Sequence, residues 1–180
     1  MKKLNLRASE CVENVSFIQY LENIEELTYW CDSKRIQGIE STGALINLKK
    51  LHLFTPKLTQ LEFLRGNTEL KELLLSTGEI KNFSFFTSLL DLRKLTVSID
   101  TLHKNHQIFE LGKIEELLVI CNNVQDLNDF VKFKNLKKLN LPFLALDSNI
   151  LFLKFMPLNK LWARKEIEWI NKNIEEVLLV

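Results

Sequence analysis

The chain has 180 residues, 46% of them hydrophobic, and its 24 lysines and arginines nearly balance its 23 aspartates and glutamates. This composition is typical of one globular domain, and a net charge of +1 excludes a general attraction to nucleic acid or to an anionic membrane. No stretch approaches the roughly 20 apolar residues that cross a bilayer, and no apolar segment of a signal peptide follows the first lysines. We therefore expect a cytoplasmic protein that binds neither membranes nor nucleic acid.

A short leucine-rich phrase recurs along the whole chain and predicts its elements in order. Each copy has the form Leu-x-x-Leu-x-Leu with apolar substitutes, and six successive copies between residues 48 and 163 repeat every 22 residues. Two looser copies precede them, and one follows after a step of 16 residues. A fixed period of about 20–29 residues indicates a solenoid. We expect nine strands, near residues 3–6, 24–29, 48–53, 70–75, 92–97, 114–119, 136–141, 158–163 and 174–179.

The second half of each repeat has a different apolar spacing. Counted from the first leucine, apolar residues fall at positions 1, 4, 6, 11, 14, 17 and 20, with insertions in the first two units, one of them near Ser33 and Lys34. Positions 4 and 6 alternate with polar residues, which predicts a short strand. Positions 11 to 20 recur every third residue, which predicts a 3₁₀-like or short helical return segment. One repeat cannot bury its own apolar face, so the repeats should stack around a shared core.

With these apolar positions in register, the chain resembles the leucine-rich repeat family, and in particular the 22-residue class of bacterial internalin-type domains. The resemblance implies an α/β leucine-rich repeat solenoid, with residues 1–180 as a single domain. A curved parallel sheet would form its concave face and the return segments its convex face. The family places asparagine at position 9, where only Asn122 conforms. Irregular turns are therefore expected at the others, which are Ser9, Asp32, Pro56, Gly78, Asp100, Leu144 and Glu166.

Charged residues fill positions 2 and 3 of the repeats, and acidic rungs largely alternate with basic ones. Glutamates share these two columns with lysines, which favours a structural role over general acid catalysis. Charged side chains at the same position of neighbouring parallel strands would lie about 5 Å apart. Opposite charges attract at this distance, whereas a register slipped by one rung would place like charges beside each other. A binding stripe for a charged partner is the alternative. The columns read Lys2-Lys3, Glu25-Glu26, Lys49-Lys50, Lys71-Glu72, Arg93-Lys94, Glu115-Glu116, Lys137-Lys138, Asn159-Lys160 and Glu175-Glu176.

Residues suited to catalysis or metal binding are sparse. His103 and His106 have helical spacing but no third ligand, and the five glycines form no phosphate-binding loop. Cys31 and Cys121 occupy equivalent positions four rungs apart, roughly 19 Å at the spacing of stacked strands, which is beyond disulfide reach. Reduced thiols fit a cytosolic protein. We expect no catalytic residue, no metal site and no cofactor.

The candidate binding residues lie at positions 5, 7 and 8, which should point away from the core because positions 4 and 6 point into it. Exposed aromatic and apolar side chains that are rimmed by charge mark interaction sites, and Trp and Arg are frequent hot spots. Packing of these side chains on one another, or cover by a loop, is the alternative. The expected partner-binding set is Trp30, His52, Phe54, Leu74, Leu118, Ile120, Phe143, Trp162 and Arg164.

These features favour a non-catalytic module that binds a protein partner through the concave face. By resemblance to small bacterial repeat proteins, a toxin-neutralising immunity protein is the preferred case. A regulatory or adaptor subunit that docks on a cellular enzyme is the alternative, and an enzyme such as a repeat-containing ubiquitin ligase is disfavoured. The first rung is polar enough to serve as a cap, whereas the last strand is apolar and could mediate self-association through its edge.

Overall fold

The computed structural model describes residues 1–8, 14–32, 37–77, 80, 82–102, 107–124, 128–142, 153, 156–163 and 176–179. It divides the chain into two compact units, Met1–Leu92 and Arg93–Val180. Each unit repeats the same element pair, a parallel strand followed by a short return segment.

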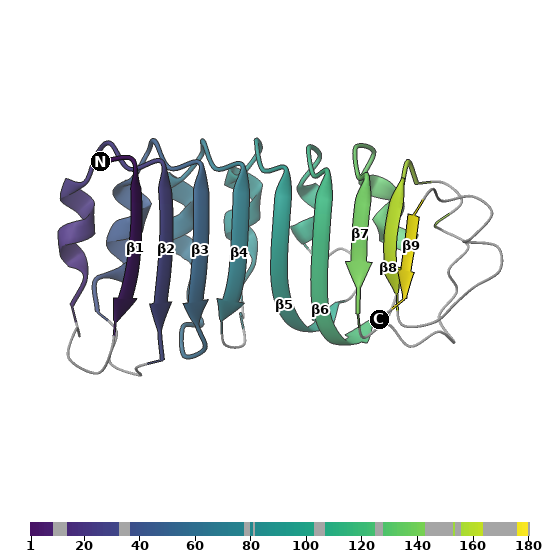
Figure 1. Cartoon of the computed structure of the whole chain (residues 1–180), viewed down its shortest axis with the longest axis horizontal. Helices are drawn as coiled ribbons and strands as arrows, with labels where there is room; N and C mark the ends of the chain where they lie inside the picture. The colour runs from purple at the N-terminus through teal and green to yellow at the C-terminus, as the bar shows by residue number, and fades with distance from the viewer. Residues whose placement is uncertain are drawn as a thin grey trace. The chain divides into compact units, whose positions relative to one another are not determined.

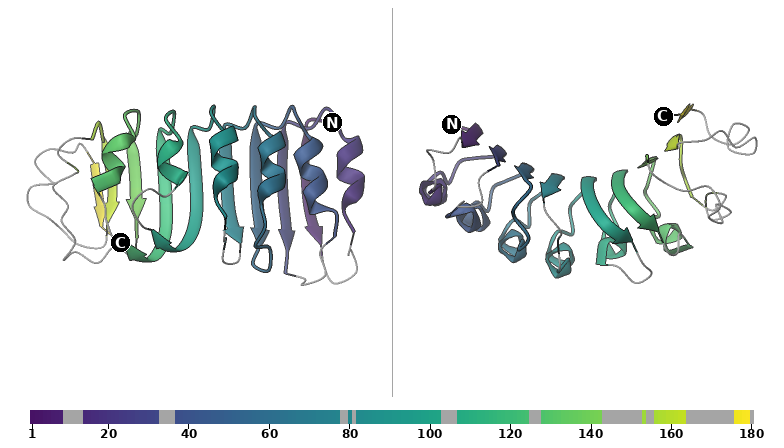
Figure 2. Two further views of the ribbon diagram at one scale, coloured as in Figure 1. Left: turned by 180° about the vertical axis from the view of Figure 1, so that it is seen from behind. Right: turned by 90° about the horizontal axis from the view of Figure 1, so that it is seen from below.

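The N-terminal unit contains four parallel strands that follow one another in chain order (Figure 1). The leucine columns are in register, with Leu4 opposite Leu27, Leu27 opposite Leu51 and Leu51 opposite Leu73. The return segments are 3₁₀ helices and lie behind the strands (Figure 2). The strands are β1 (Lys3–Ala8), β2 (Glu26–Cys31), β3 (Lys50–Thr55) and β4 (Glu72–Thr77), and the return segments are η1 (Ser16–Tyr20), η2 (Ile39–Ala44), η3 (Glu62–Gly66) and η4 (Ser84–Ser88).

The C-terminal unit continues the pattern with longer strands at its start. β5 and β6 pair as far as Leu102 opposite Val124, so pairing in these two rungs extends past position 9 of the repeat, where a turn was expected. The described elements of this unit are β5 (Lys94–Leu102), η5 (Gln107–Glu110), β6 (Glu116–Val124), η6 (Asn128–Lys132), β7 (Lys138–Leu141), β8 (Lys160–Ala163) and β9 (Glu176–Leu179).

The core of each unit lies between its strands and its return segments, as the apolar spacing predicts. Strand positions 4 and 6 are buried from β2 to β7, whereas Leu4 and Leu6 of β1 are half-buried. The described residues at positions 14 and 17 of the return segments are buried as well. Aromatic rings fill the return side, with Phe85 and Phe86 in contact in the N-terminal unit, and Phe109 and Phe130 in the C-terminal unit. Phe85 is fully buried although its repeat position is not one of the seven apolar columns.

Three asparagine side chains of the described residues link neighbouring rungs, and they lie in the second half of the repeat. The buried Asn67 amide donates to the carbonyl oxygens of Thr42 and Leu45, at 2.9 and 3.1 Å. Asn47 donates to the carbonyl of Glu22, and Asn135 donates in the same way to that of Gly112. The Asn67 amide satisfies two carbonyl oxygens in a buried site, where an unpaired carbonyl would be costly, whereas the Asn47 and Asn135 bonds are exposed.

Candidate protein-binding surface

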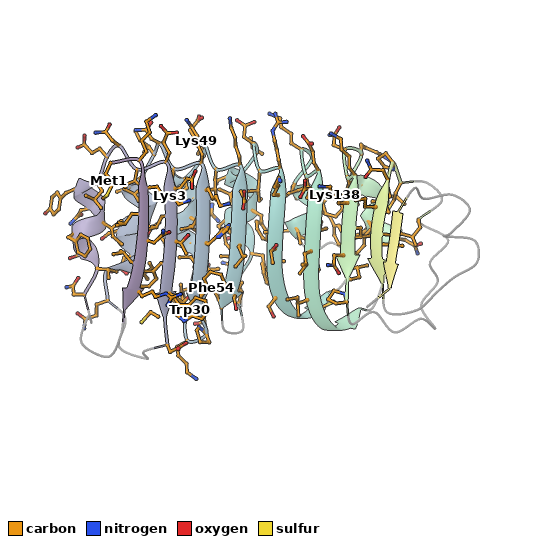
Figure 3. The ribbon with its side chains drawn as sticks, viewed as in Figure 1. Met1, Lys3, Trp30, Lys49, Phe54 and Lys138 are labelled. Carbon is orange, nitrogen blue, oxygen red and sulfur yellow. The ribbon has the colours of Figure 1, made fainter. Side chains whose placement is uncertain are left out.

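Trp30 and Phe54 form a stacked pair on the face of the sheet that points away from the core, which we call the strand face. β2 and β3 place them directly opposite each other, and their ring centroids lie 4.6 Å apart with an interplanar angle of 20°. Trp30 keeps 44% of its surface exposed, and Phe54 is half-buried. They lie side by side near the C-terminal ends of their strands (Figure 3). The two rings are therefore neighbours on the strand face, as expected for residues at position 7 of adjacent rungs.

Arg7 and His52 extend this pair to either side. The Arg7 guanidinium lies over the Trp30 ring, 5.8 Å from its centroid, in a cation–π contact. The His52 ring meets Phe54 edge-on with a centroid distance of 6.4 Å. We call Arg7, Trp30, His52 and Phe54 the aromatic patch. Sequence reasoning did not single out Arg7, although it occupies position 7 of its repeat, the same column as Trp30 and Phe54.

Glu72 fixes the imidazole at the edge of the patch. Its Oε1 lies 2.9 Å from His52 Nε2 and 2.7 Å from Lys50 Nζ. Partial burial raises the pKa of the Glu72 carboxyl, but the hydrogen bonds from Lys50 and His52 outweigh it and hold that pKa below its ordinary value. The carboxylate is thus charged near neutral pH and orients His52. The predicted Leu74 follows His52 in the same column and is half-buried.

In the C-terminal unit the strand face is apolar on β6. Leu118 is half-buried and Ile120 is 37% exposed, and their partners on β5 are Thr96 and Ser98. Trp162 lies in β8 opposite Asn140, but its side chain is outside the described part of the chain. Phe143 and Arg164 also fall outside the described residues.

The charged columns form ion pairs between rungs, as the alternation of sign predicts. In the N-terminal unit Glu25 accepts from Lys2 at 2.6 Å and from Lys49 at 2.9 Å. Lys3 pairs with Glu26 on the neighbouring strand. Hydrogen bonds from Lys2 and Lys49 lower the pKa of the Glu25 carboxyl to about 2. The lysines and glutamates of neighbouring rungs therefore balance each other's charge along this edge of the sheet.

The C-terminal unit repeats this arrangement around two glutamates. Glu115 lies 2.8 Å from both Arg93 and Lys137, and Glu116 pairs with Lys94 and Lys138. Hydrogen bonds from Lys137 and Arg93 lower the pKa of the Glu115 carboxyl.

The described residues offer little for chemistry or membrane insertion. Among them, no group of three or more His, Cys, Asp or Glu side chains is placed to hold a metal ion, and His103 and His106 lie outside that part of the chain. None of the described helical segments has the length and hydropathy to span a bilayer. Cys31 and Cys121 are buried, and burial raises the pKa of the Cys121 thiol to about 11.

No protein-family model and no curated protein sequence matches the chain. Three solved structures resemble it over most of its length. Internalin C2 of Listeria monocytogenes is 19% identical with a TM-score of 0.64, and the match covers 88% of this chain and 80% of that one. Internalin InlF of the same species is 15% identical with a TM-score of 0.70, covering 92% and 51% of the two chains.

The third structure is a leucine-rich repeat protein of Leptospira interrogans, 22% identical with a TM-score of 0.70, and the match covers 88% of this chain and 43% of that one. The chain thus spans about half or less of two of these proteins. The chain has the leucine-rich repeat fold, as its 22-residue period predicts.

Proposed function

We propose that the chain is a non-catalytic module that binds a protein partner through its strand face. The observation that carries this proposal is the stacked and exposed pair of Trp30 and Phe54. Exposed aromatic side chains with a charged rim mark interaction sites, and tryptophan is the residue type most enriched among binding hot spots. The rings are already ordered by stacking and by Arg7, so little conformational entropy is lost when a partner docks.

The charged columns support binding over catalysis. Glu25 and Glu115 resemble paired catalytic acids in the sequence, but each is held between two cations. Their pKa values are lowered, whereas a general acid needs a raised one. Because these charges pair with each other, we expect apolar contact at the aromatic patch to dominate the binding free energy. The affinity for the partner should therefore depend only weakly on salt concentration.

The preferred partner is a toxin that the chain neutralises in the cytoplasm by covering its surface. The alternative is a regulatory role, in which the chain docks on a cellular enzyme and positions it. Both use the same surface and differ in the partner. Affinity capture from the native cell separates them: a single toxin encoded beside this protein supports the first, and a housekeeping enzyme supports the second.

The site is tested with variants in the same capture experiment. Trp30→Ala with Phe54→Ala should weaken binding by about 30-fold or more, the equivalent of a hot spot of roughly 2 kcal/mol. Trp30→Ala with Trp162→Ala tests whether both predicted tryptophans contribute. The matched control is Ile46→Ala with Leu90→Ala, which removes exposed apolar side chains in turns outside the strands. Unchanged capture by the aromatic variants, with loss in the control, would move the site away from the strand face.

A further inference from the structure

The aromatic patch carries a positively charged group at one end. The Arg7 guanidinium lies 5.8 Å from the centroid of the Trp30 ring, Trp30 stacks on Phe54, and His52 meets Phe54 edge-on. Arg7 is exposed, and Trp30 keeps 44% of its surface exposed. A partner side chain that packs on the indole therefore also approaches the guanidinium.

The outward positions around the rings contain no acidic residue. Positions 5 and 7 of β1 to β4 hold Asn5, Arg7, Thr28, Trp30, His52, Phe54, Leu74 and Ser76. On this face of the four strands the acids are Glu26 and Glu72 at position 3, where they pair with Lys3 and Lys50. Position 3 lies about 13 Å along a strand from position 7. This separation exceeds the screening length of about 8 Å at physiological ionic strength, so these acids neutralise Arg7 only weakly.

The other nearby charges do not cancel that of Arg7 either. Asp32 is exposed two residues after Trp30, and no ion pair joins it to Arg7 among the described contacts. The paired lysines and glutamates of position 2 begin the strands, and Lys49 of this column lies at the opposite ends of the strands from Trp30 and Phe54 (Figure 3). Within the described residues, the patch is an apolar surface with an excess of positive charge at one side.

We propose that the aromatic patch selects a segment of the protein partner in which an acidic side chain neighbours an apolar one. The apolar side chain packs on Trp30 and Phe54, and the carboxylate accepts hydrogen bonds from Arg7, whose planar donors match a carboxylate. The inference rests on the proposed function and adds the chemistry of the partner. One exposed ion pair contributes little affinity, so the acid decides which segment binds and in which orientation, while apolar contact supplies most of the affinity.

The test uses the full chain and three blocked dipeptides that differ in one side chain, acetyl-Glu-Phe-amide, acetyl-Gln-Phe-amide and acetyl-Lys-Phe-amide. Binding is followed by NMR from the chemical shift of the Trp30 indole N–H, at millimolar peptide and low ionic strength. The glutamate peptide should bind about 3- to 10-fold more tightly than the glutamine peptide, and the lysine peptide most weakly. Equal affinities for the three peptides, or a preference for lysine, would overturn the inference.

Two variants assign the preference to Arg7. Arg7→Gln should bind the glutamate and glutamine peptides equally, and retained affinity for the glutamine peptide shows that the rings are still in place. Lys71→Gln is the matched control, because it removes the same charge from an exposed residue directly before β4, at the opposite end of the strand. It should keep the preference for glutamate. A preference that survives in Arg7→Gln, or is lost equally in both variants, contradicts the inference. Loss of all three peptides in Arg7→Gln also contradicts it, because Arg7 would then order the rings rather than select the acid.

The outcomes separate this inference from the proposed function. Peptides that shift the Trp30 indole with equal affinity would leave the patch as a binding surface and remove only the acidic preference. Peptides that leave the indole unshifted would overturn the inference, whereas the proposed function is decided by capture of the partner with Trp30→Ala and Phe54→Ala.

Discussion

Glu25 shows how position in the repeat decides what a residue does. Next to Glu26 it looks like half of a catalytic acid pair, but its carboxylate accepts from Lys2 and Lys49 and its pKa falls to about 2. The sequence predicted this role because lysines occupy the same columns in other rungs. Arg7 was missed by the same reasoning, although its column was known, because a cation–π contact across strands depends on side-chain rotamers that periodicity does not specify.

Glu25 should make stability depend on pH in the acid range. Its folded pKa of about 2 lies below the ordinary value of 4.5, so its contribution is fully present above about pH 4.5 and is lost as the pH falls towards 2. Urea denaturation of wild type and Glu25→Gln between pH 7 and pH 2 should show a small difference that shrinks through this window. The effect should be reduced by salt, because the pairs are exposed. A difference that grows at low pH would contradict the assignment.

Burial should keep the thiol of Cys121 unreactive in the folded chain. Its pKa of about 11 leaves almost no thiolate at pH 8, and the thiolate is the reactive form. In a Cys11→Ser background, a chromogenic disulfide reagent should modify Cys31 and Cys121 only as fast as the chain opens, and both should react at once in denaturant. Rapid labelling of Cys121 in the native chain would show that this rung is open to solvent.

At the scale of elements, two glycines let neighbouring return segments approach closely. A Cβ added to Gly43 in η2 would collide with the carbonyl oxygen of Phe63 in η3, and one added to Gly66 in η3 would collide with the carbonyl of Gly43. The obstacles are backbone atoms, so neither collision is relieved by a rotamer change. The apolar spacing could not predict this requirement, because glycine contributes no side chain to the pattern.

Gly66→Ala should therefore destabilise the chain by about 1–3 kcal/mol, as expected for overpacking against a rigid neighbour. Gly112→Ala is the matched control, since a Cβ there meets no atom within 4 Å. It should be neutral or slightly stabilising, because alanine restricts the unfolded chain. Urea midpoints of the two variants test this directly, and equal midpoints would refute the close approach of η2 and η3.

The charged columns should contribute most to stability where the glutamates of one rung lie between cations of the two neighbouring rungs. Glu115→Lys with Glu116→Lys would place lysines beside Arg93, Lys94, Lys137 and Lys138, replacing four attractive pairs with repulsive ones. We expect a lower thermal midpoint at low ionic strength and partial recovery at about 1 M salt, where the screening length is about 3 Å. A midpoint unaffected by salt in this variant would argue against a role for the columns in register.

At the scale of the whole molecule, the repeat predicted the fold well because a solenoid is local. Each rung contacts its neighbours, so an apolar pattern of 22 residues specifies strand, return segment and register together. The pattern did not predict the buried Asn67 amide, the buried Phe85 or the uncovered Leu4 and Leu6. These depend on how one particular rung packs, and a column average does not contain that information.

The candidate site could be predicted only in part. The position-7 column places Trp30 and Phe54 side by side, because residues in one column of adjacent rungs become neighbours in a parallel sheet. His52, at position 5 of the same strand as Phe54, faces the same side of the sheet. Their role in binding remains a proposal. The repeat pattern does not identify the partner, because binding depends on how well two surfaces fit and this sequence specifies only one of the two surfaces.

Hydroxyl-radical footprinting of the captured complex tests the central claim most directly. The oxidation rates of Trp30 and Phe54 are compared with and without the partner, with Ile46 and Leu90 as exposed references outside the strands. We predict a loss of oxidation at the two aromatic residues, with the references unchanged. Continued oxidation of Trp30 at the free rate, together with protection of Ile46 and Leu90, would contradict binding through the strand face.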